Sequence, residues 1–146
     1  MQTAIYIGLA FLMGTSMSIY LPMNSSMSKY VGSSITANVI FFSVGLVTSM
    51  LILVLFGETD TLARTRDVPI HLFLTGFLSA FIVLGATFLI PHIGARIFFI
   101  LLVTGQVLMA VAVSHFGILE SPMDPIGIKK LIGAALVITG AIISAG

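Results

Sequence analysis

The residues of this chain that could do chemistry are a few uncharged polar side chains inside long apolar runs. Gln106 is the clearest of them, because it lies near the middle of about twenty residues without a charge. An amide in hydrocarbon must find hydrogen-bond partners, so it points at another helix or at a polar cavity rather than at lipid. Gln106 is therefore predicted either to contact a solute in a cavity or to join two helices by a hydrogen bond worth about 1 kcal/mol.

Four further side chains are candidates for lining the same cavity: Asn24, Asn38, Tyr20 and Ser43. Asn38 lies nearer the end of a predicted helix than Gln106 does, which favours a structural role. Asn24 follows Pro22 and is expected to cap or turn the chain; in a broken helix it would instead present its amide to a substrate. Tyr20 is expected at the membrane interface, where tyrosine is enriched.

Two side chains near the ends of apolar runs could act as a gate or take part in proton transfer: His115 and Arg96. A histidine at such a boundary is usually just hydrated, and a proton relay is the functional alternative for His115. Arg96 is expected to extend its side chain out of the membrane, or to attract an anionic substrate at the mouth of a path. The three histidines of the chain are too scattered in the sequence to indicate a metal site.

Acidic residues are absent from every long apolar run. All five lie in predicted loops or at helix caps: Glu58, Asp60, Asp67, Glu120 and Asp124. Small proton-coupled multidrug antiporters exchange protons for cations on a carboxylate within the membrane, and that chemistry has no carrier here. A transporter of this kind would carry a neutral or weakly charged solute, or be coupled differently. With no cysteine and no serine–histidine, paired-aspartate or metal-ligand set at membrane depth, no catalytic residue, metal or cofactor is predicted.

The composition of the chain indicates an integral membrane protein. Of its 146 residues 58% are hydrophobic and 8% charged, whereas soluble domains carry about 25% charged residues. Six basic and five acidic residues could not cover the surface of a soluble fold of this size. No basic stripe is present that would neutralise phosphates, so nucleic acid is not an expected partner.

Five apolar runs are each long enough to cross the ~30 Å hydrocarbon core as a helix. They predict an all-α membrane domain of residues 1–146 with spans at about 3–21, 35–56, 69–90, 95–114 and 125–144. The charged residues 58–67 are predicted to be a solvated loop. The connection 91–94 is so short that the third and fourth spans are expected to be antiparallel neighbours.

Helix ends are predicted from proline and from capping residues. Pro22 is expected to end the first helix, and a serine of Ser33-Ser34 to cap the second. Asp67 and Asp124 are each followed closely by a proline, a pattern typical of a helix N-terminus. They are the predicted N-caps of the third and fifth helices.

Small residues recur at spacings that let helices approach closely. Two pairs are four residues apart, Gly14 with Ser18 and Gly76 with Ala80. The residues predicted at helix contacts are Gly14, Ser18, Gly45, Gly76, Ala80, Gly105, Gly133 and Gly140.

An odd number of spans places the two ends of the described chain on opposite sides of the membrane. Five helices are too few to enclose a path, so we expect a dimer, and inverted repeats are common in secondary transporters. With the N-terminus inside, one side carries four basic residues (Arg64, Arg66, Lys129, Lys130) and the other two (Lys29, Arg96). This weak bias favours N-in but permits insertion both ways, which would give an antiparallel homodimer. A singly oriented protein, or one that pairs with a homologous, oppositely oriented chain, is the alternative.

A set of short motifs occurs in order along nearly the whole chain: Gly14 through Asn24, Gly32-Ser33, Ala37, Phe42-Ser43-Val44-Gly45, Gly76-Phe77-Leu78-Ser79-Ala80, Pro91-His92-Ile93-Gly94-Ala95, Gly105-Gln106, His115-Phe116-Gly117, Pro122, Gly133 and Gly140. The set resembles the YdcZ-like inner-membrane exporters, a five-span family of the bacterial drug/metabolite transporter superfamily. Two positions depart from that pattern. Tyr20 stands where the family often has glutamine, which makes Tyr20 a candidate for lining a vestibule, and Ser114 stands where the family often has aspartate.

The resemblance implies small-molecule transport by a multi-pass protein of the bacterial cytoplasmic (inner) membrane. We therefore expect a secondary transporter or exporter that works as an inverted dimer, with a midplane cavity near Gln106 and Asn38. Its partners would be the lipid bilayer, a second chain of opposite orientation and a small-molecule substrate that the sequence does not identify. The alternative is a small membrane subunit that stabilises or regulates a partner membrane protein without transporting anything.

Overall fold

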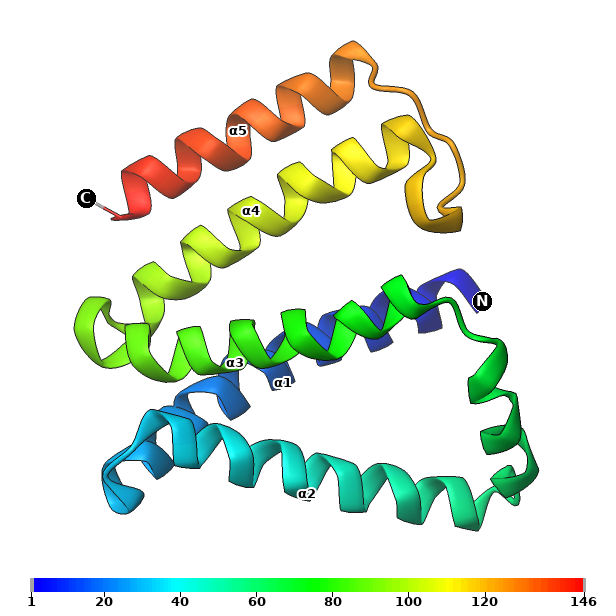
Figure 1. The fold of residues 1–146 in the computed structure, drawn as a ribbon. Helices are drawn as coiled ribbons and strands as arrows, with labels where there is room; N and C mark the ends of the chain where they lie inside the picture. Colours follow the sequence, from blue (N-terminus) through cyan, green and yellow to red (C-terminus); the bar gives the residue numbers. More distant parts are fainter. Residues whose placement is uncertain (1, 146) are drawn as a thin grey trace. The chain divides into compact units, whose positions relative to one another are not determined.

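Helices build the described part of the chain, residues 2–145 of a computed structural model. Its elements in chain order are α1 (Gln2–Val31), α2 (Ser34–Leu55), η1 (Thr59–Asp67), η2 (Ile70–Phe73), α3 (Leu74–Ile93), α4 (Ala95–Phe116), η3 (Ile118–Glu120) and α5 (Ile128–Ala145) (Figure 1). Those labelled η are short 3-10 helices. No strand occurs within residues 2–145, so the all-α prediction is confirmed.

Four helical segments are long and apolar enough to cross a membrane: α1, α2, the stretch Ile70–Ile93 and α4. α5 is not among these four, so the fifth span stays a prediction. The chain divides into two compact units. The first, Met1–His92, holds α1, α2 and nearly all of α3; the second, Ile93–Gly146, holds α4 and α5.

α1 continues through Pro22 to Val31, so the prediction that this proline ends the first helix is wrong. Proline removes one backbone hydrogen bond and crowds the preceding turn, but membrane helices tolerate it where neighbouring helices hold the segment. The residues around Pro22 are held in this way, because Leu21 is completely buried and Asn24 is 2% exposed. With 30 residues, α1 is about 45 Å long, so it extends beyond a ~30 Å hydrocarbon core.

The core of the first unit is formed by the second half of α1, the first turns of α2 and the second half of α3. The ring of Tyr20 stacks on that of Phe41, with 5.5 Å between their centroids, and Ala37 is completely buried. Gly32, with a φ of 71°, makes the tight turn between the two helices. Ser33 caps α2, because its side chain accepts a hydrogen bond from the backbone N–H of Thr36 at 3.2 Å. This confirms the predicted serine cap.

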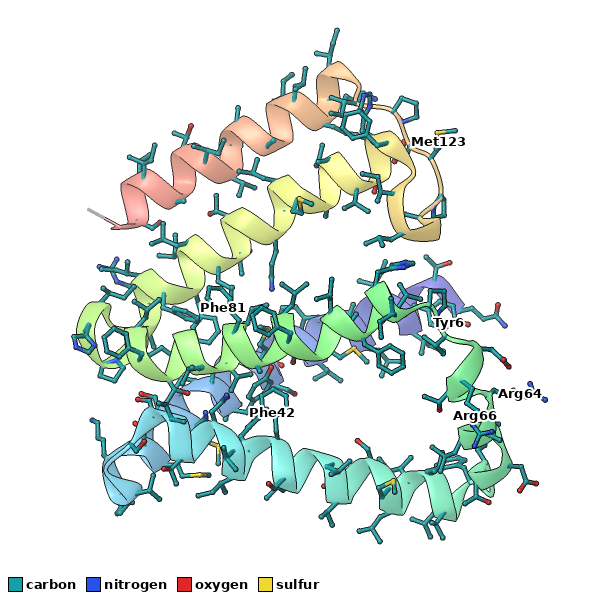
Figure 2. The ribbon with its side chains drawn as sticks, in the orientation of Figure 1. Tyr6, Phe42, Arg64, Arg66, Phe81 and Met123 are labelled. Atoms are coloured by element: carbon teal, nitrogen blue, oxygen red, sulfur yellow. The ribbon has the colours of Figure 1, made fainter. Side chains whose placement is uncertain are left out.

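The charged link between α2 and α3, predicted to be a solvated loop, contains the 3-10 helix η1. It is exposed, and Figure 2 shows the side chains of Arg64 and Arg66 extending from it. Asp67 is the last residue of η1 and does not cap the third helix, so that prediction is wrong. The reason is local: Pro69 disfavours helical geometry in the residue before it, and Val68 is extended with a ψ of 124°. The next helix starts only after this break, as η2.

α4 and α5 form the second unit and run side by side in opposite directions (Figure 1). α3 passes through Pro91 and ends at Ile93, later than predicted, so that Gly94 alone links it to α4. Gly94 has a φ of 80°, a conformation that glycine adopts without strain. Gly117 ends α4 in the left-handed region, with a φ of 60°, as expected of a glycine after a helix.

Large apolar side chains are exposed on the helices of both units. Phe11 is 72% exposed, Val54 64% and Ile142 69%. In water such surface would drive association. In a bilayer, lipid tails or the apolar face of another helix cover it.

Candidate functional site

The most deeply buried polar side chains lie where α1 meets α3 in the first unit. Asn24, Ser25 and Thr87 are 2%, 3% and 0% exposed. The Asn24 Nδ2 donates to Thr87 Oγ1 at 2.6 Å, and the Ser25 Oγ donates to the Thr87 carbonyl at 3.3 Å. Asn24 is thus an interhelical residue inside α1, and the expectation that it caps or turns the chain is wrong.

The hydroxyl of Thr87 bonds both its own helix and the Asn24 amide. Thr87 Oγ1 donates its one hydrogen to the Val83 carbonyl at 2.7 Å. In this arrangement it accepts from Asn24, whose NH₂ group faces Thr87. The Asn24 Oδ1 then faces away from Thr87. It is buried and has no hydrogen-bond donor among the described residues.

Asn38 of α2 carries a second buried amide oxygen that no described residue donates to. Its position relative to Asn24 follows from the stacked pair Tyr20 and Phe41. Asn24 is one turn after Tyr20, and Asn38 is three residues before Phe41, so each shares the face of its aromatic neighbour. Because a two-residue turn joins α1 to α2, the two helices are antiparallel. Asn24 and Asn38 therefore both lie on their helices between the stacked residues and that turn.

An open groove of about 410 Å³ lies between α2 and α3 beside Asn38. Its lining consists of Asn38, Val39, Phe42, Ser43 and Leu46 from α2, and Gly76 and Ala80 from α3. Figure 2 shows Phe42 on the side of α2 that faces α3. The groove runs from Asn38, about one turn inside α2, to Leu46 near the midpoint of that helix. Four residues singled out from the sequence, Asn38, Ser43, Gly76 and Ala80, thus line one groove.

The other polar groups at this end of the unit are bonded locally. The Ser43 Oγ donates to the Val39 carbonyl at 2.8 Å, so its lone pairs remain accessible from the groove. Tyr20 is 36% exposed and stacked on Phe41. The groove itself combines an apolar lining that includes Phe42 with two polar side chains, Asn38 and Ser43, a pattern typical of small-molecule sites.

Gln106 lies in the other unit, at the midpoint of α4, and is exposed. It lines neither of two grooves between α4 and α5, one beside Thr104 and Gly140 and one beside Ser114 and Lys130. Gln106 therefore does not join α4 to α5. In a membrane the Gln106 amide still requires hydrogen-bond partners, and these must come from outside the α4–α5 hairpin.

The glycines predicted at helix contacts leave free space within each unit. A Cβ added to any of these six glycines would have no described atom of a neighbouring element within 4 Å: Gly14, Gly45, Gly76, Gly105, Gly133 and Gly140. The hydroxyl of Ser18, another residue of this set, donates to the Gly14 carbonyl of its own helix at 3.2 Å. These small faces remain open to a partner helix beyond the unit, and the contacts predicted for them stay predictions.

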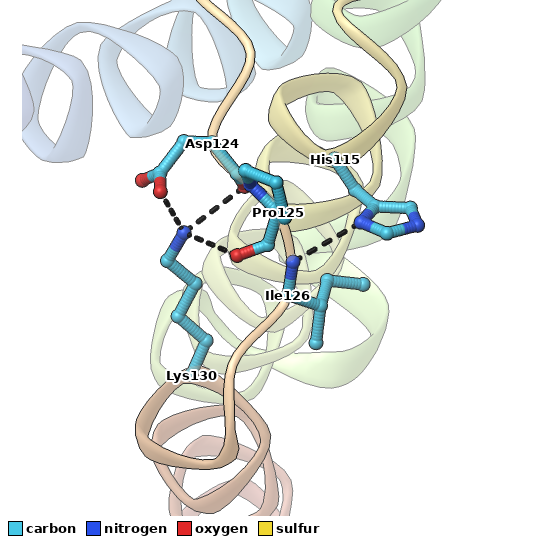
Figure 3. A network of polar contacts seen from close by, with 5 residues as sticks. All are labelled: His115, Asp124, Pro125, Ile126 and Lys130. Carbon is cyan, nitrogen blue, oxygen red and sulfur yellow. Dashed lines mark hydrogen bonds and ion pairs between the residues drawn. The ribbon is translucent and has the colours of Figure 1, made fainter.

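A polar network joins the end of α4 to the segment before α5 (Figure 3). His115 Nδ1 accepts from the backbone N–H of Ile126 at 3.1 Å. Lys130 donates to the carbonyls of Asp124 and Pro125 at 3.0 and 2.9 Å and pairs with the Asp124 carboxylate. Asp124 is thus held by Lys130, and the prediction that it caps the fifth helix is wrong. α5 begins only at Ile128, because Asp124 and Pro125 are used in this turn.

Arg96 joins α4 to α5 at the end of the hairpin that is opposite to this network. Its Nη1 donates to the carbonyl of Ser144, in the last turn of α5. The final carbonyls of a helix lack intrahelical donors and carry partial negative charge, so a guanidinium stabilises them. This contact is a structural use of Arg96, and a role for Arg96 or His115 as a gate stays a prediction.

Thr87 and Ser25 are the two residues of the site that the sequence analysis missed. Thr87 lies inside the third apolar run, three residues before its predicted end, and the reasoning applied to Gln106 would have flagged it. It also continues the helical spacing of the buried residues Val83, Ala86 and Ile90. Among the residues described, no group of three or more metal-ligating side chains occurs.

Comparison with known proteins gives one match. The model of a family described as "Putative inner membrane exporter, YdcZ" matches residues 5–143 of the chain. No curated protein and no solved structure matches at the level searched.

Proposed function

Because the chain belongs to the YdcZ family of inner-membrane exporters, we propose that it is a small-molecule secondary transporter that works as an inverted dimer. Family membership and the apolar helices establish a multi-pass protein of the inner membrane. The family is one of exporters and not of enzymes. The dimer, the cavity and the residues that bind the solute are the content of the proposal.

The observation that carries the proposal is the groove beside Asn38. It reaches from near the start of α2 to the middle of that helix and is lined by two polar side chains, Asn38 and Ser43, among apolar ones. No described residue donates to the Asn38 oxygen, so this amide is free to turn and to present its oxygen or its NH₂ group to the groove. A polar solute that bonds the amide on its way through the groove accounts for its presence in an otherwise apolar stretch.

The second copy is supported by what each unit leaves uncovered. The groove is open, the glycines at potential contacts have free space beside them, and Gln106 is exposed at mid-helix. A copy inserted upside down would place another set of small faces and another Gln106 near the membrane midplane. α5, with 18 residues, is about 27 Å long, which serves as a fifth span together with its flanking residues.

Flux through purified protein tests the function. Protein in liposomes should accelerate the entry of one or more members of a panel of small polar solutes, measured as swelling by stopped-flow light scattering. Asn38→Leu should reduce that flux at least about tenfold, since it removes the polar group, and Gln106→Ala should also weaken it. Val44→Leu changes an exposed apolar side chain of the same helix that does not line the groove, and it serves as the control.

Two results would count against the proposal. Flux that is unchanged in both Asn38→Leu and Gln106→Ala would remove the site. Liposomes that show no flux for any solute, although the protein is folded and co-purifies stoichiometrically with another membrane protein, would favour the non-transporting subunit.

A further inference from the structure

We propose that His115 makes the connection between α4 and α5 sensitive to pH, because its imidazole binds the segment before α5 only while the ring is uncharged. This connection comprises residues 117–127. The property belongs to the second unit alone, so it does not require transport through the groove beside Asn38.

The hydrogen bond between Ile126 and His115 requires one form of the imidazole (Figure 3). The backbone N–H of Ile126 can only donate, and its nitrogen lies 3.1 Å from Nδ1 of His115. This Nδ1 must therefore carry no hydrogen, and the neutral ring has its hydrogen on Nε2. In a charged imidazole both nitrogens carry hydrogens, so no acceptor is left for the Ile126 N–H, whichever way the ring turns. Gain of a proton by His115 thus breaks the bond.

Two backbone N–H groups of the described connection donate to α4. That of Asp124 donates to the Ser114 carbonyl at 2.8 Å, and that of Ile126 donates to His115. Only the second bond ends on a side chain that can change its charge. The held segment also contributes Asp124 to the lining of a pocket of about 290 Å³ between α4 and α5, so release of the segment from α4 alters this pocket.

The same connection contains a strained residue. Leu119 of η3 has a φ of 59° and a ψ of 41°, a left-handed conformation that is uncommon for residues other than glycine. Such a conformation costs free energy and persists only where the surrounding contacts hold it. Loss of the bond to His115 removes one contact of the connection and therefore favours its relaxation.

Histidine is the side chain whose charge ordinarily changes between about pH 5 and 8. The other titratable residues on the elements that pack against the end of α4 are Glu120, the last residue of η3, and Asp124, Lys129 and Lys130. Asp124 and Lys130 pair with each other. Carboxyl and ammonium groups ordinarily change their charge outside this range. The segment is therefore expected to be bound to α4 at the upper end of the range and to be released as the pH falls.

His92 provides a comparison within the chain. Its Nδ1 lies 2.6 Å from the carbonyl oxygen of Phe88, which can only accept, so this Nδ1 carries a hydrogen. A further proton goes to Nε2 and leaves the bond to Phe88 in place. Protonation thus keeps the contact of His92 and breaks that of His115.

Exchange of the Ile126 amide hydrogen with water measures the bond. It is followed by NMR on the purified full chain in detergent micelles, between about pH 5 and 8, and is expressed as protection relative to an unstructured chain at the same pH. Protection is expected to fall about fivefold as the pH is lowered. The nitrogen chemical shifts of His115 report its protonation in the same samples, and both changes should have the same midpoint.

Two substitutions separate the acceptor from the charge. His115→Asn places an amide oxygen near the position of Nδ1 and does not titrate, so Ile126 should keep its protection at every pH. His115→Leu has no acceptor, so protection should be about fivefold lower than in the original chain at high pH and should not change with pH. His92→Asn is the matched control and should leave the pH dependence at Ile126 unchanged.

Three results would overturn the proposal. The first is a chemical shift showing a hydrogen on Nδ1 of neutral His115, because the bond from Ile126 would then not exist. The second is protection of Ile126 that stays constant from about pH 5 to 8, whether or not His115 changes its charge. The third is a pH dependence that persists in both His115→Asn and His115→Leu, which would assign it to another group of the connection.

Discussion

At the scale of single residues, one buried contact joins two helices of the first unit. Thr87 donates to the Val83 carbonyl and accepts from the Asn24 amide, whose oxygen has no donor among the described residues. The local sequence favours a cap or a turn at Asn24 after the first span. The contact with a residue 63 positions away gives it another role, which no local pattern around Pro22 could indicate.

The strength of this contact can be measured by a double-mutant cycle with Asn24→Ala and Thr87→Val. Interhelical hydrogen bonds in membrane proteins contribute about 0.6 kcal/mol on average and up to about 1.7. We expect a coupling energy in that range from unfolding in mixed detergent micelles, because the bond is completely buried. A cycle of Asn24→Ala with Thr75→Val is the control, since the Thr75 hydroxyl donates to Leu72 of its own helix. Coupling indistinguishable from that control would show that the two side chains do not bond.

At the scale of elements, α4 and α5 form a hairpin held by polar contacts at both ends. Arg96 binds the last turn of α5, while Ser114 accepts from the backbone N–H of Asp124 at 2.8 Å at the other end. Between these ends α4 and α5 pack through apolar and small side chains, whose contacts are not directional and so specify the register of the two helices poorly. The polar ends therefore set the register of the hairpin.

Lys130 and Lys129 are adjacent, and only Lys130 forms contacts with the turn before α5. Lys130→Met is expected to speed hydrogen exchange of the Asp124 and Ile126 amides by about fivefold. The ion pair of Lys130 with Asp124 is partly exposed, so its net contribution to the stability of the turn is about 1 kcal/mol. Lys129→Met removes the same charge from an exposed side chain and should leave both amides unchanged. Equal effects of the two substitutions would mean that charge, and not the contacts of Lys130, holds the turn.

At the scale of the whole molecule, the open question is which way the chain inserts. The basic residues divide four to two between the predicted sides, and Arg64 and Arg66 of η1 account for the difference. Both are exposed on a segment between two membrane-capable helices. The bias is small enough for both orientations to occur, which an antiparallel homodimer requires.

Replacing Arg64 and Arg66 by alanine leaves two basic residues on each side. Reporters fused to the C-terminus should appear on both faces of the membrane in the original chain and should shift toward equal amounts in this variant. The variant Glu58→Gln with Asp60→Asn is the control, because acidic residues contribute little to orientation. A reporter found on one face only, in the original chain and in both variants, would exclude the homodimer and require a second chain.

The sequence by itself determined the class of the protein. Apolar runs of helical length with few charges can be stable only as membrane helices, so the all-α fold, the membrane location and most of the helices followed from composition and length. Ser33 was found as a cap because capping depends on a few adjacent residues. The same reasoning placed Asn38, Ser43, Gly76 and Ala80 among the candidates, since polar and small residues in membrane helices face other helices.

Only the tertiary structure decided where α1 ends and what its asparagine does. Pro22 would end an isolated helix, but contacts on both sides of it compensate for the lost hydrogen bond. In the same way Asp124 follows a capping pattern but is bound by Lys130. The polarity of the Asn24 amide depends on which atom donates to which across two helices. Such directions arise from packing between distant segments, and local sequence cannot contain them.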